Sequence, residues 1–375
     1  MRVALQADQL AFAAPGGIAT YVRNLAPALA RRDADVTLVH ARAGAWTAEP
    51  WMAGMRVVEI PRGVRTLYPA WDLLGRPALR VEADVVHATN PAGVAPRARG
   101  RALVVTVHDL AVERMPELFP ARWRWLYRAG LRAAVRRADA ILVPSRATAA
   151  DLMERTGIEA SRVRVTPLAA ALPSASSDDG AARRSRLGLP ERYVLAAGTL
   201  EPRKNLVRLV RAYRRAVADA GLPHALVLAG PDGWGNDELE RTLAAGGAGT
   251  VVRTGALASE DLDAVYRGAA AFLYPSLLEG FGLPVLEAMA RGVPVVTSNV
   301  SSLPEVTGDA ALLVDPYDVR AIADGIHAVL TDETLRATLR RRAVSSDSVW
   351  AALTRLIQSA GRANGPSASH GICVA

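Results

Sequence analysis

The chain has 375 residues, half of them hydrophobic, and this length exceeds what one hydrophobic core usually serves, so two globular domains are expected. The only cysteine is Cys373 and the longest apolar runs have the length of a strand. These features exclude a disulfide framework, a thiolate metal site and a transmembrane helix and, with no signal-peptide core, predict a cytoplasmic protein. The formal net charge of +8 favours anionic partners such as nucleotides, phosphates or acidic lipid surfaces, whereas the scattered arginines and the missing recognition motifs argue against nucleic acid.

Strand-length apolar runs rich in Val, Ile and Leu alternate with longer helical patterns along the chain. This alternation is typical of parallel sheets covered by helices on both faces, so we predict an α/β fold of two Rossmann-like, doubly wound domains. Strands are expected at residues 2–7, 36–40, 57–60, 84–89, 102–108, 140–145 and 162–167, and then at 193–198, 225–230, 250–255, 271–276, 293–298 and 311–316.

The predicted elements fall into two groups, which place one domain at residues 1–168 and the other at 191–342. Between them, residues 169–190 are rich in Pro, Ser, Ala and Asp and have no sustained period, which predicts a linker. Residues 343–375 offer one amphipathic stretch and then a Gly, Ser, Asn and Pro-rich end, so an atypical, partly disordered tail is expected.

In the first domain, Gly16 and Gly17 follow the first predicted strand and directly precede the helical pattern IATYVRNLAPALA. A glycine-containing loop at a helix N-terminus suits phosphate, because the exposed N–H groups point at the ligand. A tight turn that needs no ligand would use the same residues, so the two interpretations stay open.

Two histidines end predicted strands of the first domain: His87 in DVVHAT, and His108, followed by Asp109, in ALVVTVH. The carboxyl ends of parallel strands form the ligand-binding edge of such a sheet. A lone histidine at a strand end is more often structural than catalytic, and this interpretation is adopted for His87. Beside Asp109 and a phosphate, His108 is expected to change its charge near neutral pH.

The helix predicted at residues 121–140 combines six arginines with Trp123, Trp125 and Tyr127. The first interpretation is a surface helix that packs its aromatic side chains on the first domain. The alternative is peripheral contact with an anionic membrane, which would serve a lipid-linked acceptor.

In the second domain, the loop GTLEPRKN places Arg203 and Lys204 after the first predicted strand. Two cations at this edge can neutralise a pyrophosphate and stabilise it as a leaving group. A solvated basic turn is the alternative, but the same sheet is expected to carry two glutamates at this edge.

Those glutamates belong to EGFGLPVLE, which follows the predicted strand AFLYPS. Pro284 fits the first turn of a helix, which places Glu279 on the preceding loop and Glu287 in the first turn. Gly280 and Gly282 let a ligand approach the backbone, and carboxylates there accept hydrogen bonds from sugar or ribose hydroxyls. Taken singly, the two acids would be a solvated loop residue and a favourable partner of the helix dipole.

With its two glutamates separated by seven residues, EGFGLPVLE resembles the signature of retaining family 4 glycosyltransferases of the GT-B fold. The resemblance covers roughly residues 1–342 and is strongest to the mannosyltransferases of O-antigen and exopolysaccharide assembly. Five further segments carry it in the same order along the chain: GGIATYV (16–22), TVHDL (106–110), GTLEPRKNL (198–206), LAGPDGWG (228–235) and SNVSSLPEV (298–306).

The resemblance implies two domains that face each other across a cleft, the first on the acceptor side and the second binding the nucleotide sugar. It implies that Arg203 and Lys204 stabilise the leaving diphosphate, that Glu287 holds the ribose and Glu279 the donor sugar, and that His108 contacts the transferred sugar. The implied catalytic residues are His108, Glu279, Arg203 and Lys204. The implied donor site consists of Gly16, Gly17, Arg203, Lys204, Glu279, Gly280, Phe281, Gly282, Leu283 and Glu287.

The implied activity is that of a retaining hexosyltransferase of cell-surface polysaccharide biosynthesis. It would move a hexose, preferably mannose, from a nucleoside diphosphate, GDP before UDP, to a glycan or lipid-linked acceptor. No cofactor and no metal are expected, because neither Asp33-Ala34-Asp35 nor Asp261-Leu262-Asp263 stands at the carboxyl end of a predicted strand. The rivals are a non-catalytic sugar- or nucleotide-binding protein, an inactive glycosyltransferase with a damaged C-terminus, and an NAD-dependent dehydrogenase, although no GxGxxG follows a predicted strand.

After the last arginine-rich helix, the sequence departs from the family. Members usually continue with an aromatic-Ser-Trp-like segment and a helix that returns to the first domain, and residues 343–375 resemble neither. Our hypothesis is a shift of the reading frame near residue 343, and resequencing the 3′ end of the gene tests it.

Overall fold

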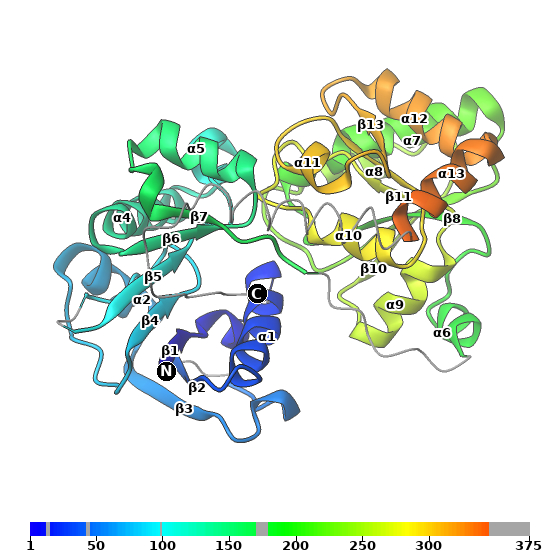
Figure 1. The fold of residues 1–375 in the computed structure, drawn as a ribbon. Helices are drawn as coiled ribbons and strands as arrows, with labels where there is room; N and C mark the ends of the chain where they lie inside the picture. The colour runs from blue at the N-terminus through cyan, green and yellow to red at the C-terminus, as the bar shows by residue number, and fades with distance from the viewer. Residues whose placement is uncertain (13–15, 43–45, 98–99, 170–178, 345–375) are drawn as a thin grey trace. The chain divides into compact units, whose positions relative to one another are not determined.

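The computed structural model describes residues 1–12, 16–42, 46–97, 100–169 and 179–344 (Figure 1). These residues form two compact units, unit 1 up to residue 168 and unit 2 from residue 169. Each unit contains one sheet, and every strand pairs with its neighbours in parallel. The prediction of two doubly wound α/β domains is therefore confirmed, while the tail and Cys373 lie outside the described residues.

Unit 1 has a seven-stranded sheet in the order β3-β2-β1-β4-β5-β6-β7. The chain order reverses between β1 and β4, which pair directly with Val3 opposite Val85. In sheets of this kind, ligands bind outside the carboxyl ends of the strands at this switch point. The strands are β1 (Arg2–Gln6), β2 (Asp35–Arg42), β3 (Arg56–Gly63), β4 (Val85–Ala88), β5 (Ala102–Thr106), β6 (Ala140–Val143) and β7 (Val163–Val165).

Because side chains alternate along a strand, the two faces of this sheet bury different helices. Leu5 and Leu38 pack with Val22 of α1 on one face, whereas Val105 and Ile141 belong to the cluster on the other face, which includes residues of α4 and α5 (Figure 1). The helices are α1 (Gly17–Ala30), α2 (Val64–Pro69), α3 (Ala111–Arg114), α4 (Ala121–Arg137) and α5 (Arg146–Thr156), with short 3₁₀ or π turns η1 (Asp8–Ala11), η2 (Pro50–Met52), η3 (Ala70–Leu74), η4 (Pro116–Leu118) and η5 (Ala160–Arg162).

Unit 2 repeats the same topology with six strands in the order β10-β9-β8-β11-β12-β13. Its switch point lies between β8 and β11, which pair with Phe272 opposite Leu195. All thirteen strands expected from the sequence are thus present. The strands are β8 (Tyr193–Ala197), β9 (Ala225–Ala229), β10 (Val251–Gly255), β11 (Phe272–Tyr274), β12 (Val295–Ser298) and β13 (Leu312–Val314).

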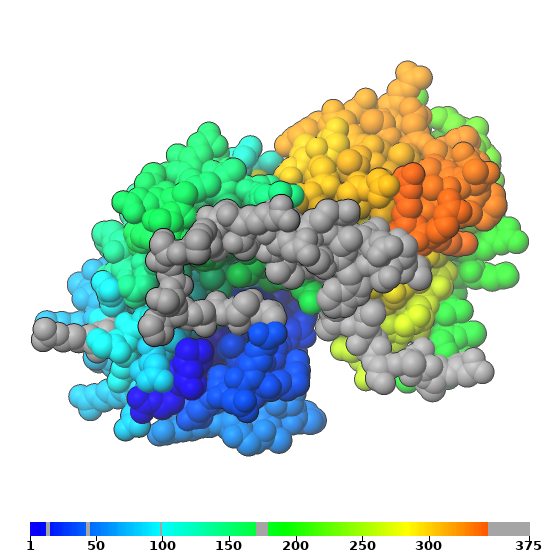
Figure 2. Space-filling model, in the orientation of Figure 1, coloured from blue at the N-terminus to red at the C-terminus, as the bar shows by residue number. Residues whose placement is uncertain are grey.

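Helices cover both faces of the second sheet. Leu226 and Leu273 pack with Leu209 of α7 and Ile326 of α12, and Tyr266 of α9 contacts Phe272 with ring centres 5.4 Å apart. Figure 2 shows α13, in orange-red, on the outer surface of the unit. The helices are α6 (Gly180–Arg186), α7 (Leu206–Ala220), α8 (Asp237–Ala244), α9 (Ser259–Gly268), α10 (Leu283–Ala290), α11 (Leu303–Thr307), α12 (Val319–Thr331) and α13 (Glu333–Val344), with the 3₁₀ turn η6 (Pro202–Lys204).

Two local expectations need correction. Part of the expected linker is the helix α6, which is held on α9 because Arg183 and Arg186 form ion pairs with Asp261 at 3.0 and 2.9 Å. Glu287 lies in the second turn of α10 rather than the first, since that helix begins at Leu283, although Pro284 does occupy the first turn.

Candidate active site

The strongest constellation of charged side chains in unit 2 lies at its switch point. Arg203 and Lys204 belong to η6, directly after β8, and Glu279 belongs to the loop that follows β11. Because β8 and β11 are neighbours, their carboxyl-end loops meet. Two segments more than seventy residues apart in sequence thereby supply one site.

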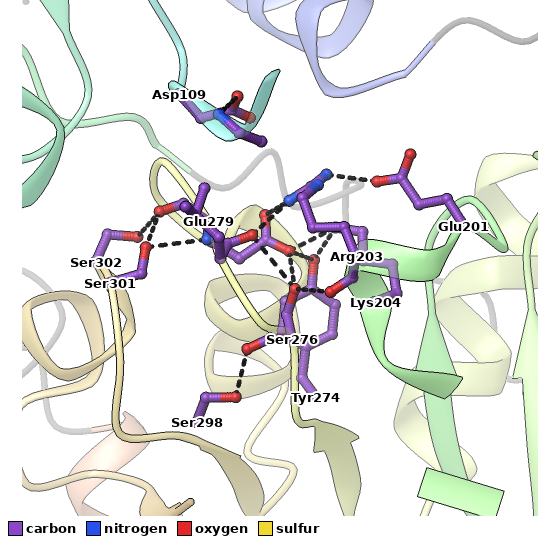
Figure 3. Close-up of polar contacts among 12 residues, drawn as sticks. Asp109, Glu201, Arg203, Lys204, Tyr274, Ser276, Glu279, Ser298, Ser301 and Ser302 are labelled. Atoms are coloured by element: carbon purple, nitrogen blue, oxygen red, sulfur yellow. Dashed lines mark hydrogen bonds and ion pairs between the residues drawn. The ribbon is translucent and has the colours of Figure 1, made fainter. Parts of the chain in front are cut away.

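The two cations bind the carboxylate of Glu279 directly (Figure 3). The Arg203 guanidinium lies 2.8 Å from Oε2, and the Lys204 ammonium lies 2.7 Å from Oε1. The side chains of Arg203 and Lys204 are 12% exposed and that of Glu279 is 8% exposed. Each oxygen of the buried carboxylate therefore has its own cation.

Lys204 is the only lysine in the chain, which otherwise uses arginine as its basic residue. Its ammonium also donates to the Tyr274 hydroxyl at 2.5 Å. An ammonium has three N–H groups, and these two bonds leave one without an acceptor in the described part of the chain. That N–H is available to a ligand oxygen.

Neutral and acidic neighbours complete the set. The Ser276 hydroxyl donates to Glu279 Oε1 at 2.6 Å, and Tyr274 donates to the same oxygen at 3.0 Å. Glu201 accepts from Arg203 at 2.6 Å. Two cations and two carboxylates thus balance within this cluster, which explains how four charged side chains persist in a buried position.

The protonation states follow from this balance. Burial alone would raise the pKa of Glu279, but the charges of Arg203 and Lys204 and the hydrogen bonds from Lys204 and Ser276 lower the pKa to about 2. Burial and the neighbouring Arg203 lower the pKa of Lys204. The cluster therefore contains a firmly ionised carboxylate.

Serine hydroxyls hold the backbone of the Glu279 loop from the other side (Figure 3). The Ser301 hydroxyl accepts from the Glu279 N–H at 3.0 Å and donates to its carbonyl oxygen, and Ser302 donates to that oxygen at 2.9 Å. Ser301 has φ +62°, a left-handed conformation that is uncommon outside glycine. Ser298 adds a 2.6 Å bond to the carbonyl of Ser276.

In the glycine-rich part of the loop, the backbone conformation requires glycine at one position. Gly282 has φ +101°, and a Cβ there would lie 2.7 Å from Leu303, so only glycine fits. Gly280 and Phe281 are buried, and Leu283 starts α10. The loop thus turns sharply from Glu279 into the helix.

Glu287 has a different environment from Glu279. Its carboxylate accepts from the Tyr266 hydroxyl at 3.2 Å, and Arg291 donates to its backbone carbonyl at 2.8 Å. Burial raises the pKa of Glu287, although Arg291 and Tyr266 counteract this. One acid of the pair is therefore locked in an ionic cluster, whereas the other is held by a neutral phenol.

In unit 1, Gly16 is the N-cap residue of α1 and Gly17 its first residue. A Cβ on either glycine would meet no described atom within 4 Å, and Gly16 has φ −96°. Nothing in the described chain therefore requires glycine at either position. The predicted role in donor binding remains a prediction.

The predicted histidines lie in one buried aromatic and polar group of unit 1. Tyr21 of α1 contacts the His108 ring edge-on, with centres 5.0 Å apart, and its hydroxyl lies 3.2 Å from that of Thr106. The Thr106 hydroxyl lies 2.8 Å from Nε2 of His87. Burial lowers the pKa of His87 to about 3 and raises that of Tyr21 to about 12.

His108 forms a hydrogen bond of 2.9 Å between its Nε2 and the carbonyl oxygen of Thr89. Since a carbonyl only accepts, Nε2 carries the proton. Burial lowers the pKa of His108 despite Asp109 and the bond to Thr89, so the ring is neutral at pH 7 with Nδ1 as an acceptor. In the protein alone, this lowered pKa moves the change of charge of His108 away from neutral pH, and its dependence on a nearby phosphate remains a prediction.

Three hydroxyl groups of this site could not be predicted from the sequence, although their residues lie in or beside the segments named above. Tyr274 and Ser276 precede Glu279 in AFLYPS, and Ser301 lies in SNVSSLPEV. Their hydroxyls look unremarkable in sequence because each finds its partner only through the folded loop. Among the described residues, no group of three or more His, Cys, Asp or Glu side chains is placed to hold a metal ion, and no helix is long and apolar enough to cross a membrane.

Two family models match the chain. The model described as "Glycosyltransferase Family 4" matches residues 15–170, and that described as "Glycosyl transferases group 1" matches residues 179–345. Together they span both units and include every predicted site residue.

Known proteins agree with these matches. The O-antigen chain mannosyltransferase B of Escherichia coli is 36% identical over 302 residues, which is 76% of this chain and 75% of that protein. The D-inositol 3-phosphate glycosyltransferase of Salinispora arenicola is 32% identical over 95% of this chain and 90% of its own. The crystal structure of Anabaena Alr3699/HepE in complex with UDP and glucose has a TM-score of 0.70 at 20% identity and covers 96% of this chain and 100% of that one.

Proposed function

The chain belongs to the family 4 glycosyltransferases of the GT-B fold, and we propose that it moves mannose from a nucleoside diphosphate to a glycan or lipid-linked acceptor in the synthesis of a cell-surface polysaccharide. The observation that carries this proposal is the buried ionic cluster of Arg203, Lys204 and Glu279 at the switch point of unit 2. The mannosyltransferase relatives support mannose. GDP is the preferred nucleoside diphosphate of the donor. The proposal also includes retention of configuration at the anomeric carbon.

The cluster supplies what the departure of a diphosphate needs. As the bond to the sugar breaks, negative charge grows on the phosphate oxygen, and cations fixed in advance stabilise that charge without reorganisation. Lys204 keeps one N–H for such an oxygen among the described residues, and Glu279 and Tyr274 hold its ammonium in place. Arg203 is fixed in the same way by Glu279 and Glu201.

The remaining roles divide between the two acids and the first unit. Glu279 would bind the hydroxyls of the donor sugar and Glu287 those of the ribose, while Gly16, Gly17 and His108 would contribute from unit 1. With Nδ1 as an acceptor, neutral His108 suits a sugar hydroxyl. In the proposed retaining reaction, no protein nucleophile is used: the acceptor attacks the face that the diphosphate leaves, and a phosphate oxygen takes its proton.

A lipid-linked acceptor would place the reaction at the inner face of a membrane. We therefore extend the proposal to a cytoplasmic enzyme with peripheral membrane contact.

The single lysine offers a direct test of the donor site. An amine-reactive reagent can label only Lys204 and the N-terminal amine, and the lowered pKa of Lys204 increases the unprotonated, reactive fraction of its amine. GDP-mannose, UDP-glucose and their nucleotides are added in turn, and the Lys204 peptide is followed by mass spectrometry, with the N-terminal peptide as the internal control. The preferred donor should protect Lys204 alone.

Turnover is measured in parallel as release of nucleotide with candidate glycan acceptors. Protection together with acceptor-dependent release supports the proposal. Protection without release with any acceptor would instead indicate a binding protein or an inactive enzyme, and labelling that no nucleotide changes would refute the donor site.

A further inference from the structure

The carboxylate of Glu287 has one fixed oxygen and one free oxygen. Oε2 accepts from the Tyr266 hydroxyl at 3.2 Å, whereas Oε1 has no partner among the residues that the structure describes and is not buried. Within the same part of the chain, Glu287 forms no ion pair, and the Tyr266 phenol is the only group that hydrogen-bonds to its carboxylate. The orientation of this half-buried acid therefore depends on Tyr266.

The side chain of Tyr266 is itself held firmly in α9. It is 1% exposed, its ring contacts Phe272 of β11, and the Arg291 guanidinium lies over the ring, 5.0 Å from its centre. A phenol donates one hydrogen bond, and the carbonyl of Pro284 lies farther from the hydroxyl, at 3.5 Å, than Glu287 does. Burial and the charge of Glu287 raise the pKa of Tyr266 well above its ordinary value, so the hydroxyl remains a donor.

Arg291 links the backbone of Glu287 to the same helix. Its Nη1 donates to the backbone carbonyl of Glu287 at 2.8 Å, and its Nε donates to the Asp263 carboxylate at 2.7 Å. The side chains of Arg291 and Asp263 are only 5% and 2% exposed, so water scarcely reaches this ion pair. Because Asp263 and Tyr266 both belong to α9, the backbone and the carboxylate of Glu287 are fixed relative to one helix.

The spacing along the two helices makes this double link possible. Residues three or four positions apart lie on the same face of a helix. Asp263 and Tyr266 are three positions apart on α9, and Glu287 and Arg291 are four positions apart on α10 (Figure 1). One face of each helix thus supplies both partners.

We propose that Tyr266 and Arg291 are positioning residues of the donor site, which hold Glu287 with Oε1 free for the ribose hydroxyls. This inference rests on the proposed function, in which Glu287 binds the ribose. A carboxylate that is oriented before binding loses less conformational freedom when the ligand arrives, so its hydrogen bonds contribute more to affinity. Tyr266 acts through Glu287, because its single proton is already donated to Oε2.

The contribution of the ribose hydroxyls to affinity tests the proposal in the full chain. Calorimetry first gives the dissociation constants of GDP and UDP, and the nucleotide that binds more tightly is then compared with its 2′,3′-dideoxy counterpart. The ratio of these two constants isolates the hydroxyls, and a general loss of stability does not change it. Thermal unfolding shows that each variant is folded.

Tyr266→Phe removes only the phenol oxygen, and Tyr213→Phe is its matched control. Tyr213 is also fully buried, and its hydroxyl donates to the backbone carbonyls of His224 and Thr250, directly before β9 and β10 at the opposite edge of the sheet. Arg291→Lys provides a second variant, which keeps a cation beside Asp263 but lacks the forked guanidinium that reaches the Glu287 carbonyl as well.

In the wild type and in Tyr213→Phe, the nucleotide should bind about tenfold more tightly than its dideoxy counterpart. In Tyr266→Phe this ratio should fall to about two- or threefold, while the constant of the dideoxy nucleotide stays unchanged. Arg291→Lys should lower the ratio less. Once Glu287→Ala has removed the carboxylate, adding Tyr266→Phe should have no further effect on the ratio.

A ratio that stays at the wild-type value in both Tyr266→Phe and Arg291→Lys would overturn the positioning role and leave the proposed function standing. A ratio that falls equally in Tyr266→Phe and Tyr213→Phe would also overturn it, because the loss of any buried hydroxyl would then suffice. Equal binding of both nucleotides by the wild type would contradict the ribose role of Glu287 in the proposed function, and this inference with it.

Discussion

The two units share one topology but carry different chemistry at their switch points. In unit 2, the loops after β8 and β11 bring together Arg203, Lys204 and Glu279, all ionised and balanced against one another. In unit 1, the group that includes His87 and His108 is neutral at pH 7, because burial lowers the pKa of both rings. A preformed ionic cluster suits a diphosphate whose charge changes during reaction, whereas neutral hydrogen-bonding rings suit the uncharged hydroxyls of a sugar.

If this division holds, the largest effect comes from the centre of the ionic cluster. Glu279→Gln keeps the shape of the side chain but removes the charge that fixes Arg203 and Lys204, so transfer should slow by about 100-fold or more. Affinity for the nucleotide alone should change little. Rates are measured under saturating donor, with Glu260→Gln, an exposed acid of α9, as the matched control. Equal rates in the two variants would break the proposed role.

The same carboxylate should make unit 2 sensitive to acid. Its pKa of about 2 in the folded chain lies below its ordinary 4.5, so its ionised form stabilises the fold above that ordinary value. This stability is lost as the pH falls from about 4.5 towards 2, by an amount on the order of 3 kcal/mol. Unfolding midpoints between pH 3 and 7 should fall less steeply in Glu279→Gln than in the wild type. Parallel curves for the two proteins would show that Glu279 does not carry the acid sensitivity.

The sequence predicted which edge of the sheet carries the site residues, but it did not predict the contacts between their side chains. Alternating apolar runs determine parallel strands, and parallel strands bring their carboxyl-end loops to one edge, so Arg203, Lys204 and Glu279 could be assigned to the same edge. Their direct pairing depends on loop geometry between segments 75 residues apart, which no local pattern contains. The Ser301 contact and the burial that keeps His108 neutral were missed for the same reason: both depend on which segments pack together.

Glu287 separates nucleotide binding from transfer within unit 2. Glu287→Ala should weaken donor binding about tenfold, the usual cost of one charged hydrogen bond, and leave the rate under saturating donor almost unchanged. Burial raises the pKa of Glu287, so donor affinity should fall as the pH decreases through that raised value. The pKa of Glu279 is shifted in the opposite direction. Calorimetric titration of the nucleotide at several pH values measures both effects. If Glu287→Ala instead slowed transfer and left donor affinity normal, Glu287 would have the role in transfer that is proposed for Glu279.

The unit 1 side of the comparison is tested at His108. His108→Phe keeps the ring contact with Tyr21 but removes the Nδ1 acceptor, so transfer should fall about tenfold while nucleotide affinity stays unchanged. Because the wild-type ring is already neutral at pH 7, the rate should show no His108 titration between pH 7 and 8. A step in that range that disappears in the variant would mean that bound donor returns the proton to His108.

The smallest effect is expected at Ser301, a positioning residue whose hydroxyl forms its hydrogen bonds, among the described residues, with the backbone of Glu279. Ser301→Ala and Ser301→Gly both remove the hydroxyl, so each should slow transfer roughly three- to tenfold with little change in KM. Glycine relieves the left-handed φ of +62° and alanine does not, so the glycine variant should be the more stable by about 1 kcal/mol. Equal slowing with unequal stability identifies a role in holding Glu279, because a purely structural serine would make rate follow stability. A glycine variant that transfers at the wild-type rate would show that backbone geometry alone positions the carboxylate.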